Sequence, residues 1–194
     1  MDHRKIHDDL PIPEDDGACN HLTNFTIPSI SLLNQDGNLL RLNRLDTFRI
    51  VLYCYPMTGR PDRPLPNNWD LIPGARGCTP QTCNFRDNYD EIVSLNAIPI
   101  GVSTQPVDDL KEMVTRLGVT YDVVSDINLR FAKKLNLPTF DIEDKVFLKR
   151  TTLIIEKSVI KKFFYPIFPP NKHINEIIKW SNFNCITMVF FKLL

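Results

Sequence analysis

The chain has 194 residues, a formal net charge of zero, 43% hydrophobic residues and 24% charged residues. These values are typical of a one-domain globular protein, and the balanced charge argues against nucleic acid or an acidic membrane surface as a partner. The N-terminal residues lack the apolar stretch of a secretory signal, and the apolar run from Cys185 to Leu194 is too short to span a bilayer. We therefore expect a cytoplasmic protein without a membrane span.

The first part of the sequence predicts an arm, two groups of strands and a long insertion. Segments 27–33 and 38–42 flank the turn-forming residues Asn34 to Gly37, which predicts a hairpin. The apolar run 49–55 predicts a buried central strand. Residues 57–76 contain four prolines and are too long for an ordinary connection, so they predict an insertion in which Trp69 packs against the domain.

The remainder predicts alternating helices and strands. Thr79 is expected to cap a helix over 80–95, with Pro80 at its first position. Further strands are predicted at 97–103, 123–126, 147–156 and 159–165, and further helices at 107–117, 129–135 and 171–180. This order predicts an α/β fold in which a mixed central sheet has helices on both faces.

We expect three regions along the chain. Residues 1–21 form an irregular arm, residues 22–182 form the domain with its insertion at 57–76, and residues 183–194 form an apolar tail of unknown role.

Five cysteines are present, and only Cys78 and Cys83 have a short, chemically suggestive spacing. Cys78 lies where a loop enters a helix, and the unpaired N–H groups and dipole of a helix N-terminus favour a thiolate. A zinc site is disfavoured because no second cysteine or histidine pair has a matching spacing. We expect Cys54 to be a buried strand residue and Cys185 to be incidental. Cys19 lies in the polar arm, where exposure would allow it an alternative resolving role.

Three segments together resemble the peroxiredoxins of the AhpC/TSA family, in particular the bacterioferritin-comigratory or Q-type group. They are Tyr53–Pro56, Gly77–Asp87 and Lys149–Ile155, and the resemblance extends from about Leu22 to Trp180. It implies a thioredoxin-like fold and reduction of hydrogen peroxide and organic hydroperoxides without a metal or other cofactor. It also implies thioredoxin or a similar dithiol as reductant, and a monomer or weak dimer.

The resemblance further assigns roles to individual residues. Cys78 would be the peroxidatic cysteine, Cys83 the resolving cysteine that forms an intramolecular disulfide with it, and Arg150 the cation that stabilises thiolate and peroxide. One position departs from the family pattern, because Ala75 stands where a peroxide-binding threonine is usual. Thr58 is the hydroxyl that we consider as its replacement.

Two alternative functions use the same fold. A thioredoxin-type thiol–disulfide oxidoreductase is disfavoured, because that chemistry uses a C-x-x-C pair and Ala75 lies three residues before Cys78. A non-enzymatic redox sensor would keep the oxidisable cysteine without efficient recycling.

Overall fold

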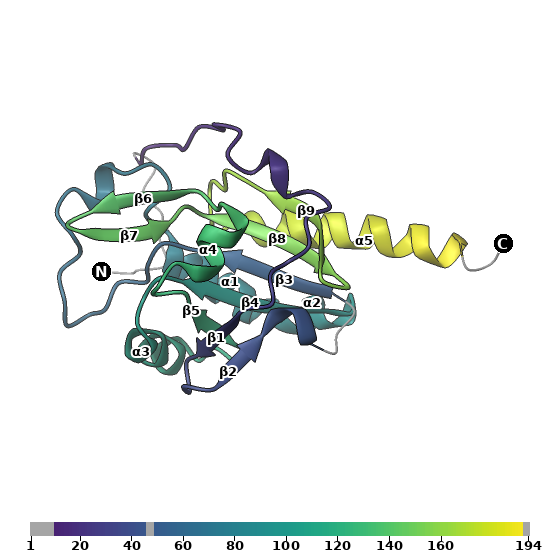
Figure 1. Cartoon of the computed structure of the whole chain (residues 1–194), viewed down its shortest axis with the longest axis horizontal. Helices are drawn as coiled ribbons and strands as arrows, with labels where there is room; N and C mark the ends of the chain where they lie inside the picture. Colours follow the sequence, from purple (N-terminus) through teal and green to yellow (C-terminus); the bar gives the residue numbers. More distant parts are fainter. Residues whose placement is uncertain (1–9, 46–48, 192–194) are drawn as a thin grey trace.

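A computed structural model of the chain describes residues 10–45 and 49–191, with side chains described as far as Phe183. Over these residues its centre is a seven-stranded sheet in the order β2-β1-β5-β4-β3-β8-β9 (Figure 1). The strands are β1 (Ser31–Asn34), β2 (Leu39–Arg41), β3 (Arg49–Cys54), β4 (Ala97–Ser103), β5 (Val123–Ser125), β8 (Thr151–Glu156) and β9 (Val159–Phe164). The sheet is mixed, because β3 is parallel to β4 and antiparallel to β8.

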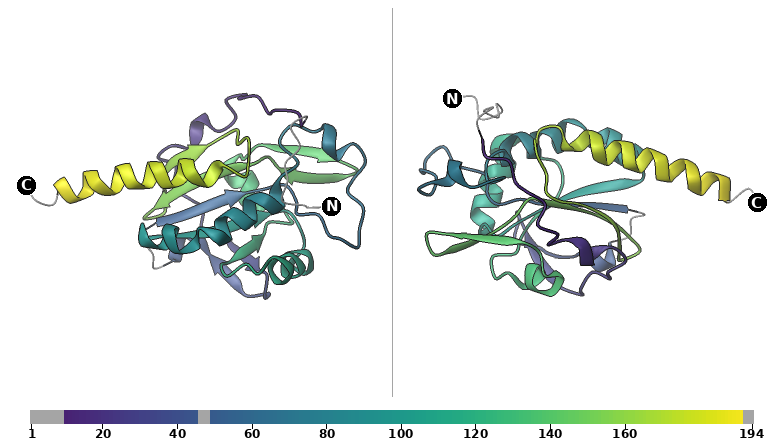
Figure 2. Two further views of the ribbon diagram at one scale, coloured as in Figure 1. Left: turned by 180° about the vertical axis from the view of Figure 1, so that it is seen from behind. Right: turned by 90° about the horizontal axis from the view of Figure 1, so that it is seen from above.

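Helices cover both faces of this sheet (Figure 2). They are α1 (Cys78–Asp87), α2 (Tyr89–Ser94), α3 (Val107–Leu117), α4 (Arg130–Leu135) and α5 (His173–Phe191), with 3-10 turns η1 (Asn20–Leu22), η2 (Leu42–Arg44) and η3 (Trp69–Leu71). Side chains alternate along the fully buried strand β3. Val51 and Tyr53 therefore pack with residues of α1, α2, α3 and α5, whereas Leu52 and Cys54 pack with α4 and the N-terminal arm. The predicted α/β fold with helices on both faces is confirmed.

The region after the insertion begins its helix earlier than predicted. Helix α1 starts at Cys78, and Gly77 precedes it in the left-handed conformation at φ 100°. Because glycine adopts this conformation without steric cost, the chain turns directly into the helix and Thr79 becomes an interior residue rather than the cap. The single helix expected over 80–95 is also divided, since Asn88 separates α1 from α2.

The strand expected over 147–156 is likewise two strands. Strand β7 (Lys145–Leu148) pairs with β6 (Thr139–Ile142) in a separate two-stranded sheet, and β8 begins at Thr151. The sequence does not predict this hairpin, because its turn residues Glu143 and Asp144 adopt positive φ angles without the usual asparagine or glycine. The break between the two sheets leaves Lys149 and Arg150 in a short connection.

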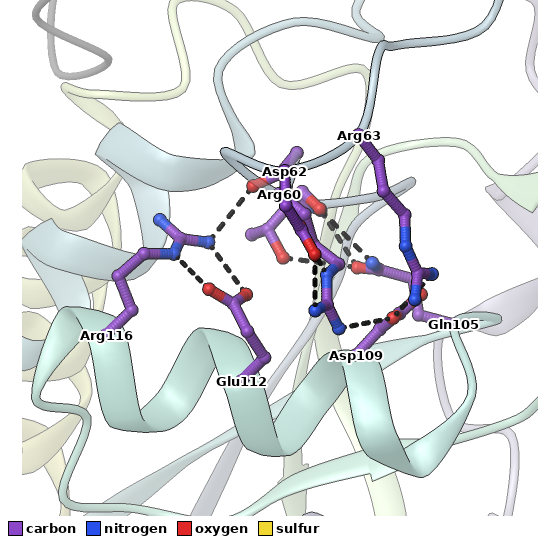
Figure 3. A network of polar contacts seen from close by, with 9 residues as sticks. Arg60, Asp62, Arg63, Gln105, Asp109, Glu112 and Arg116 are labelled. Carbon is purple, nitrogen blue, oxygen red and sulfur yellow. Dashed lines mark hydrogen bonds and ion pairs between the residues drawn. The ribbon is translucent and has the colours of Figure 1, made fainter.

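The insertion is anchored at both of its ends. Near its start, Arg60 and Arg63 bond to Asp109 on α3, and Arg116 donates to the carbonyl of Gly59 at 3.0 Å (Figure 3). Towards its end, the ring of Trp69 is buried against Phe140 and Phe147 of the β6–β7 hairpin, as an aromatic cluster. The packing of Trp69 is therefore as predicted.

The last helix is longer than the sequence predicts. It runs from His173 to Phe191, and its C-terminal part projects beyond the sheet (Figures 1 and 2). The expected tail falls mostly outside the described side chains, as does Cys185. Among the described residues, no helix is long and apolar enough to cross a membrane.

Candidate active site

Cys78 lies at the first turn of α1, at the edge of the domain core. Its side chain is 3% exposed, and its sulfur lies 3.6 Å from the carbonyl oxygen of Ala75, to which the thiol can donate. Gly77 fixes this position in two ways: its φ angle suits glycine, and a Cβ at residue 77 would collide with Pro170. The sulfur of Cys78 is therefore placed by a turn that only glycine fits.

Arg150 brings a buried positive charge against that sulfur. The arginine is 3% exposed, and its Nη2 donates to Cys78 Sγ at 3.2 Å. The same nitrogen donates to the carbonyl oxygens of Gly74 at 3.2 Å and Arg76 at 3.1 Å. A planar guanidinium has enough donors to hold the preceding loop and the sulfur together, which a lysine cannot do. The structure thus joins two predicted site residues that lie far apart in sequence.

Gln81 is a member of this site to which the sequence assigned no role. Its side-chain oxygen accepts a hydrogen bond from Arg150 Nη1, and the side chain is buried. Gln81 lies three residues after Cys78 on α1, so both side chains share one helix face. This spacing of three residues is the feature of the sequence that could have indicated that Gln81 belongs to the site. Gln81 positions the guanidinium that contacts the sulfur.

His173 at the start of α5 is a second buried polar residue near the site. Its Nε2 lies 2.9 Å from Thr152 Oγ1, and its Nδ1 lies 3.1 Å from a carboxylate oxygen of Glu176. Burial lowers the pKa of His173 to about 4, and the charge of Arg150 acts in the same direction. The imidazole is therefore neutral at neutral pH. Nothing in the sequence spacing indicates this placement.

Cys83 lies in the same helix as Cys78 and is also buried. The two sulfurs are not joined in a disulfide. Around them the core is aromatic: the ring of Tyr53 stacks on that of Phe85 with centroids 4.2 Å apart, and its hydroxyl lies 2.9 Å from that of Tyr121. The pair therefore sits in an intact, well-packed helix rather than in a loop.

The other described cysteines lie across the sheet from Cys78. Cys54 is buried as predicted, and burial raises its pKa well above the ordinary range. The exposure that we considered for Cys19 is not found: the arm packs onto the core through η1, the side chain is fully buried, and burial raises its pKa to about 11. Its sulfur lies 3.9 Å from Thr151 Oγ1 on the face opposite Cys78, which does not support a role as an alternative reaction partner.

Thr58, which we considered as a replacement for the threonine hydroxyl missing at Ala75, is hydrogen-bonded to a different residue. Thr58 is buried, and its hydroxyl donates to Oε1 of Gln105 at 3.2 Å, beside a second bond from its backbone N–H to the same oxygen. Contact with a peroxide would require Thr58 to exchange this bond for a new one. Its role in peroxide binding stays a prediction.

A cavity of about 460 Å³ adjoins the site, with Arg150 in its wall. Most of its wall is apolar and comes from three separate segments, the arm, the end of the insertion and the residues after β9; examples are Ile12, Pro13, Ile72, Pro73, Pro166 and Ile167. At one edge, Lys149 is paired with Asp16 at 2.9 Å. Among the described residues, no group of three or more histidine, cysteine or acidic side chains is arranged to hold a metal ion.

Comparison with known proteins shows what this chain is similar to and which fold it shares. The model of the AhpC/TSA family matches residues 71–163. The peroxidoxin BcpB from Mycobacterium tuberculosis superposes with a TM-score of 0.69 at 24% identity, covering 82% of this chain and 96% of that one. A PrxQ variant from Xylella fastidiosa gives a TM-score of 0.65 at 18% identity, covering 93% and 99%. The fold is that of the thioredoxin-like peroxiredoxins.

The chain is also similar in sequence to plant proteins. The chain is 27% identical over 152 residues to a chloroplastic peroxiredoxin Q from Populus jackii, a match that covers 78% of this chain and 64% of the relative. It is 27% identical over 163 residues to the chloroplastic peroxiredoxin Q from Triticum aestivum, covering 84% and 68%. The chain thus resembles the AhpC/TSA family over residues 71–163, and these two sequence relatives are peroxiredoxin Q proteins.

Proposed function

We propose that the protein is a thiol-dependent peroxidase that reduces hydrogen peroxide and organic hydroperoxides. The observation that carries this proposal is the contact of 3.2 Å between the guanidinium of Arg150 and the sulfur of Cys78 at the start of a helix. A fixed cation and a helix N-terminus both stabilise negative charge on sulfur, and the thiolate is the nucleophile that peroxide chemistry requires.

In the first step, the Cys78 thiolate attacks the terminal oxygen of the hydroperoxide. The S–O bond forms while the O–O bond breaks, so Cys78 becomes a sulfenic acid and the leaving oxygen departs as alkoxide or hydroxide, which takes a proton from solvent. Arg150 contributes because its positive charge, held against the sulfur, stabilises the negative charge that develops on the peroxide oxygens. Gln81 keeps the guanidinium in this orientation.

In the second step, the thiolate of Cys83 attacks the sulfur of the Cys78 sulfenic acid. The S–S bond forms, the S–O bond breaks, and the hydroxide that leaves takes a proton to become water. A reduced dithiol, thioredoxin or a similar protein, then restores both thiols by two exchange reactions and is itself oxidised. We further propose that the protein works in the cytoplasm as a monomer or weak dimer; the plant relatives are named as chloroplastic proteins.

The size and lining of the cavity beside Arg150 support organic hydroperoxides as substrates. At about 460 Å³, with a mainly apolar wall, the cavity offers room and a favourable environment for an apolar substituent. Arg150 forms part of that wall and also contacts Cys78. A substituent in the cavity would therefore lie close to the sulfur that attacks the peroxide.

Peptide mass spectrometry after one equivalent of hydrogen peroxide tests the proposal. In the natural chain we expect a peptide pair joined by Cys78 and Cys83. In the Cys83→Ser variant, treated with an excess of hydrogen peroxide in a parallel sample, we expect sulfinic or sulfonic acid at Cys78. Oxidation spread evenly over the cysteines, or no loss of peroxide beyond one turnover with excess thioredoxin and its reductase, would refute the peroxidase.

A further inference from the structure

Tyr55 carries a polar group with no evident structural use. It directly follows strand β3, and its side chain is fully buried in the same core cluster as Cys78. Within the described part of the chain, its hydroxyl has no hydrogen-bond partner. A buried hydroxyl without a partner costs free energy and is rare in folded proteins, so its retention calls for a reason.

The neighbouring tyrosine shows where this hydroxyl points. The rings of Tyr53 and Tyr55 are stacked, with centroids 5.5 Å apart and planes at 23°, so they extend in the same direction from the strand. The hydroxyl of Tyr53 reaches Thr82 on α1, at 3.5 Å from its Oγ1. The side chain of Tyr53 therefore faces α1 at Thr82.

The geometry of strand and helix then places Tyr55 beside the reactive cysteine. Strands β3 and β4 are parallel, so the intervening α1 runs back against the direction of β3. Two residues along a strand advance about 6.6 Å. Four residues back along a helix, from Thr82 to Cys78, cover about 6 Å. Tyr55 therefore stands level with Cys78. The pKa of its hydroxyl is raised by burial first, then by the charge of Tyr53, and then by that of Cys78.

We propose that the Tyr55 hydroxyl is a catalytic hydrogen-bond donor to the leaving oxygen of the hydroperoxide at Cys78. This inference rests on the proposed peroxidase function. During attack, the S–O bond forms and the O–O bond breaks, and negative charge accumulates on the leaving oxygen, which solvent then protonates. Tyr55 donates a hydrogen bond to that oxygen and keeps its own proton, because its pKa lies well above neutrality. It thereby supplies a hydroxyl at a site where Ala75 has none.

The test compares Tyr55→Phe with Tyr53→Phe, which removes a hydroxyl that is already bonded to Tyr121. The rate of peroxide reduction is measured by stopped flow, and stability by urea unfolding. Removing a single aligned donor from a reacting oxygen lowers rates by about 10²-fold or more, so we expect Tyr55→Phe to lose at least about tenfold. Its stability should stay equal or rise, since an unpartnered polar group is removed. Tyr53→Phe should show the reverse, with lower stability and a rate within about twofold of the parent.

Alkylation of Cys78 by iodoacetamide, followed by peptide mass spectrometry, completes the design. This reaction uses the same sulfur but no peroxide oxygen, so Tyr55→Phe should leave its rate unchanged. The proposal is overturned if peroxide reduction by Tyr55→Phe equals that of the parent, or if alkylation slows in parallel with it. An inactive parent chain, or an active Cys78→Ser variant, would instead refute the peroxidase function itself.

Discussion

Disulfide formation should open helix α1, and the size of the required movement follows from helix geometry. Cys78 and Cys83 are both within α1. Residues five apart in a regular helix are separated by about 7.5 Å along the axis and about 140° around it, which gives a Cα–Cα distance of about 8.7 Å. A disulfide requires about 4.4–6.8 Å. The two Cα atoms must therefore approach by at least about 2 Å, and a helix cannot compress by that amount while keeping its hydrogen bonds.

Oxidation with one equivalent of hydrogen peroxide is the perturbation, and amide hydrogen exchange is the assay. We expect amides between about Gly77 and Phe85 to lose protection in the disulfide form, while strand β3 and helix α3 keep theirs. The Cys83→Ser variant is the control, because it can be oxidised at Cys78 without being cross-linked and should retain a protected helix. If mass spectrometry shows the Cys78–Cys83 disulfide and exchange in this segment is unchanged, the geometric reasoning is wrong.

Three further predictions address the site and its supports. Arg150→Lys should lower the rate constant with hydrogen peroxide, measured by stopped flow, by about 10²–10³-fold. Lysine keeps the positive charge but lacks the guanidinium donors that bond to both the preceding loop and the sulfur of Cys78. A change within about twofold would contradict this reasoning. Gly77→Ala should lower the free energy of urea unfolding by about 1–3 kcal/mol more than Gly118→Ala. Both glycines have positive φ angles, but only at residue 77 would the added Cβ collide with Pro170. Equal losses in the two variants would refute the steric argument. The pKa of His173 is about 4 in the folded protein and about 6.5 unfolded, so the unfolded state binds the proton first as pH falls. Stability should thus decrease from about pH 6.5 down to about pH 4, by at most about 3 kcal/mol, and His173→Asn should flatten this slope in urea titrations; an unchanged slope would exclude His173 as its cause.

Elements with strong local signals were predicted well from sequence. The β-branched run of β3 and the amphipathic helix α3, which ends at Gly118 in the left-handed conformation, lie where expected. The hairpin β6–β7 was missed because its turn lacks the residues that normally mark one. Its strands are also stabilised by the insertion, through Trp69, which is a contact that no local pattern encodes.

Some residues of the candidate site could likewise be predicted from the sequence, and others could not. Cys78 and Cys83 stand out through their spacing, and Arg150 through the family resemblance. Gln81 had a usable signal in its position one helix turn after Cys78. The placements of Cys19, His173 and Tyr55 depend on which segments meet across the sheet, so burial and unsatisfied hydrogen bonds become visible only in three dimensions.

The central claim is that Cys78 is a sulfur activated toward peroxide by the helix and guanidinium around it. Stopped-flow mixing of the reduced protein with hydrogen peroxide tests this most directly, with free cysteine and the Cys78→Ser variant as references. The account predicts a second-order rate constant at least about 10²-fold above that of free cysteine, lost entirely on substitution of Cys78. A rate no faster than that of free cysteine, or one that survives the substitution, would contradict it.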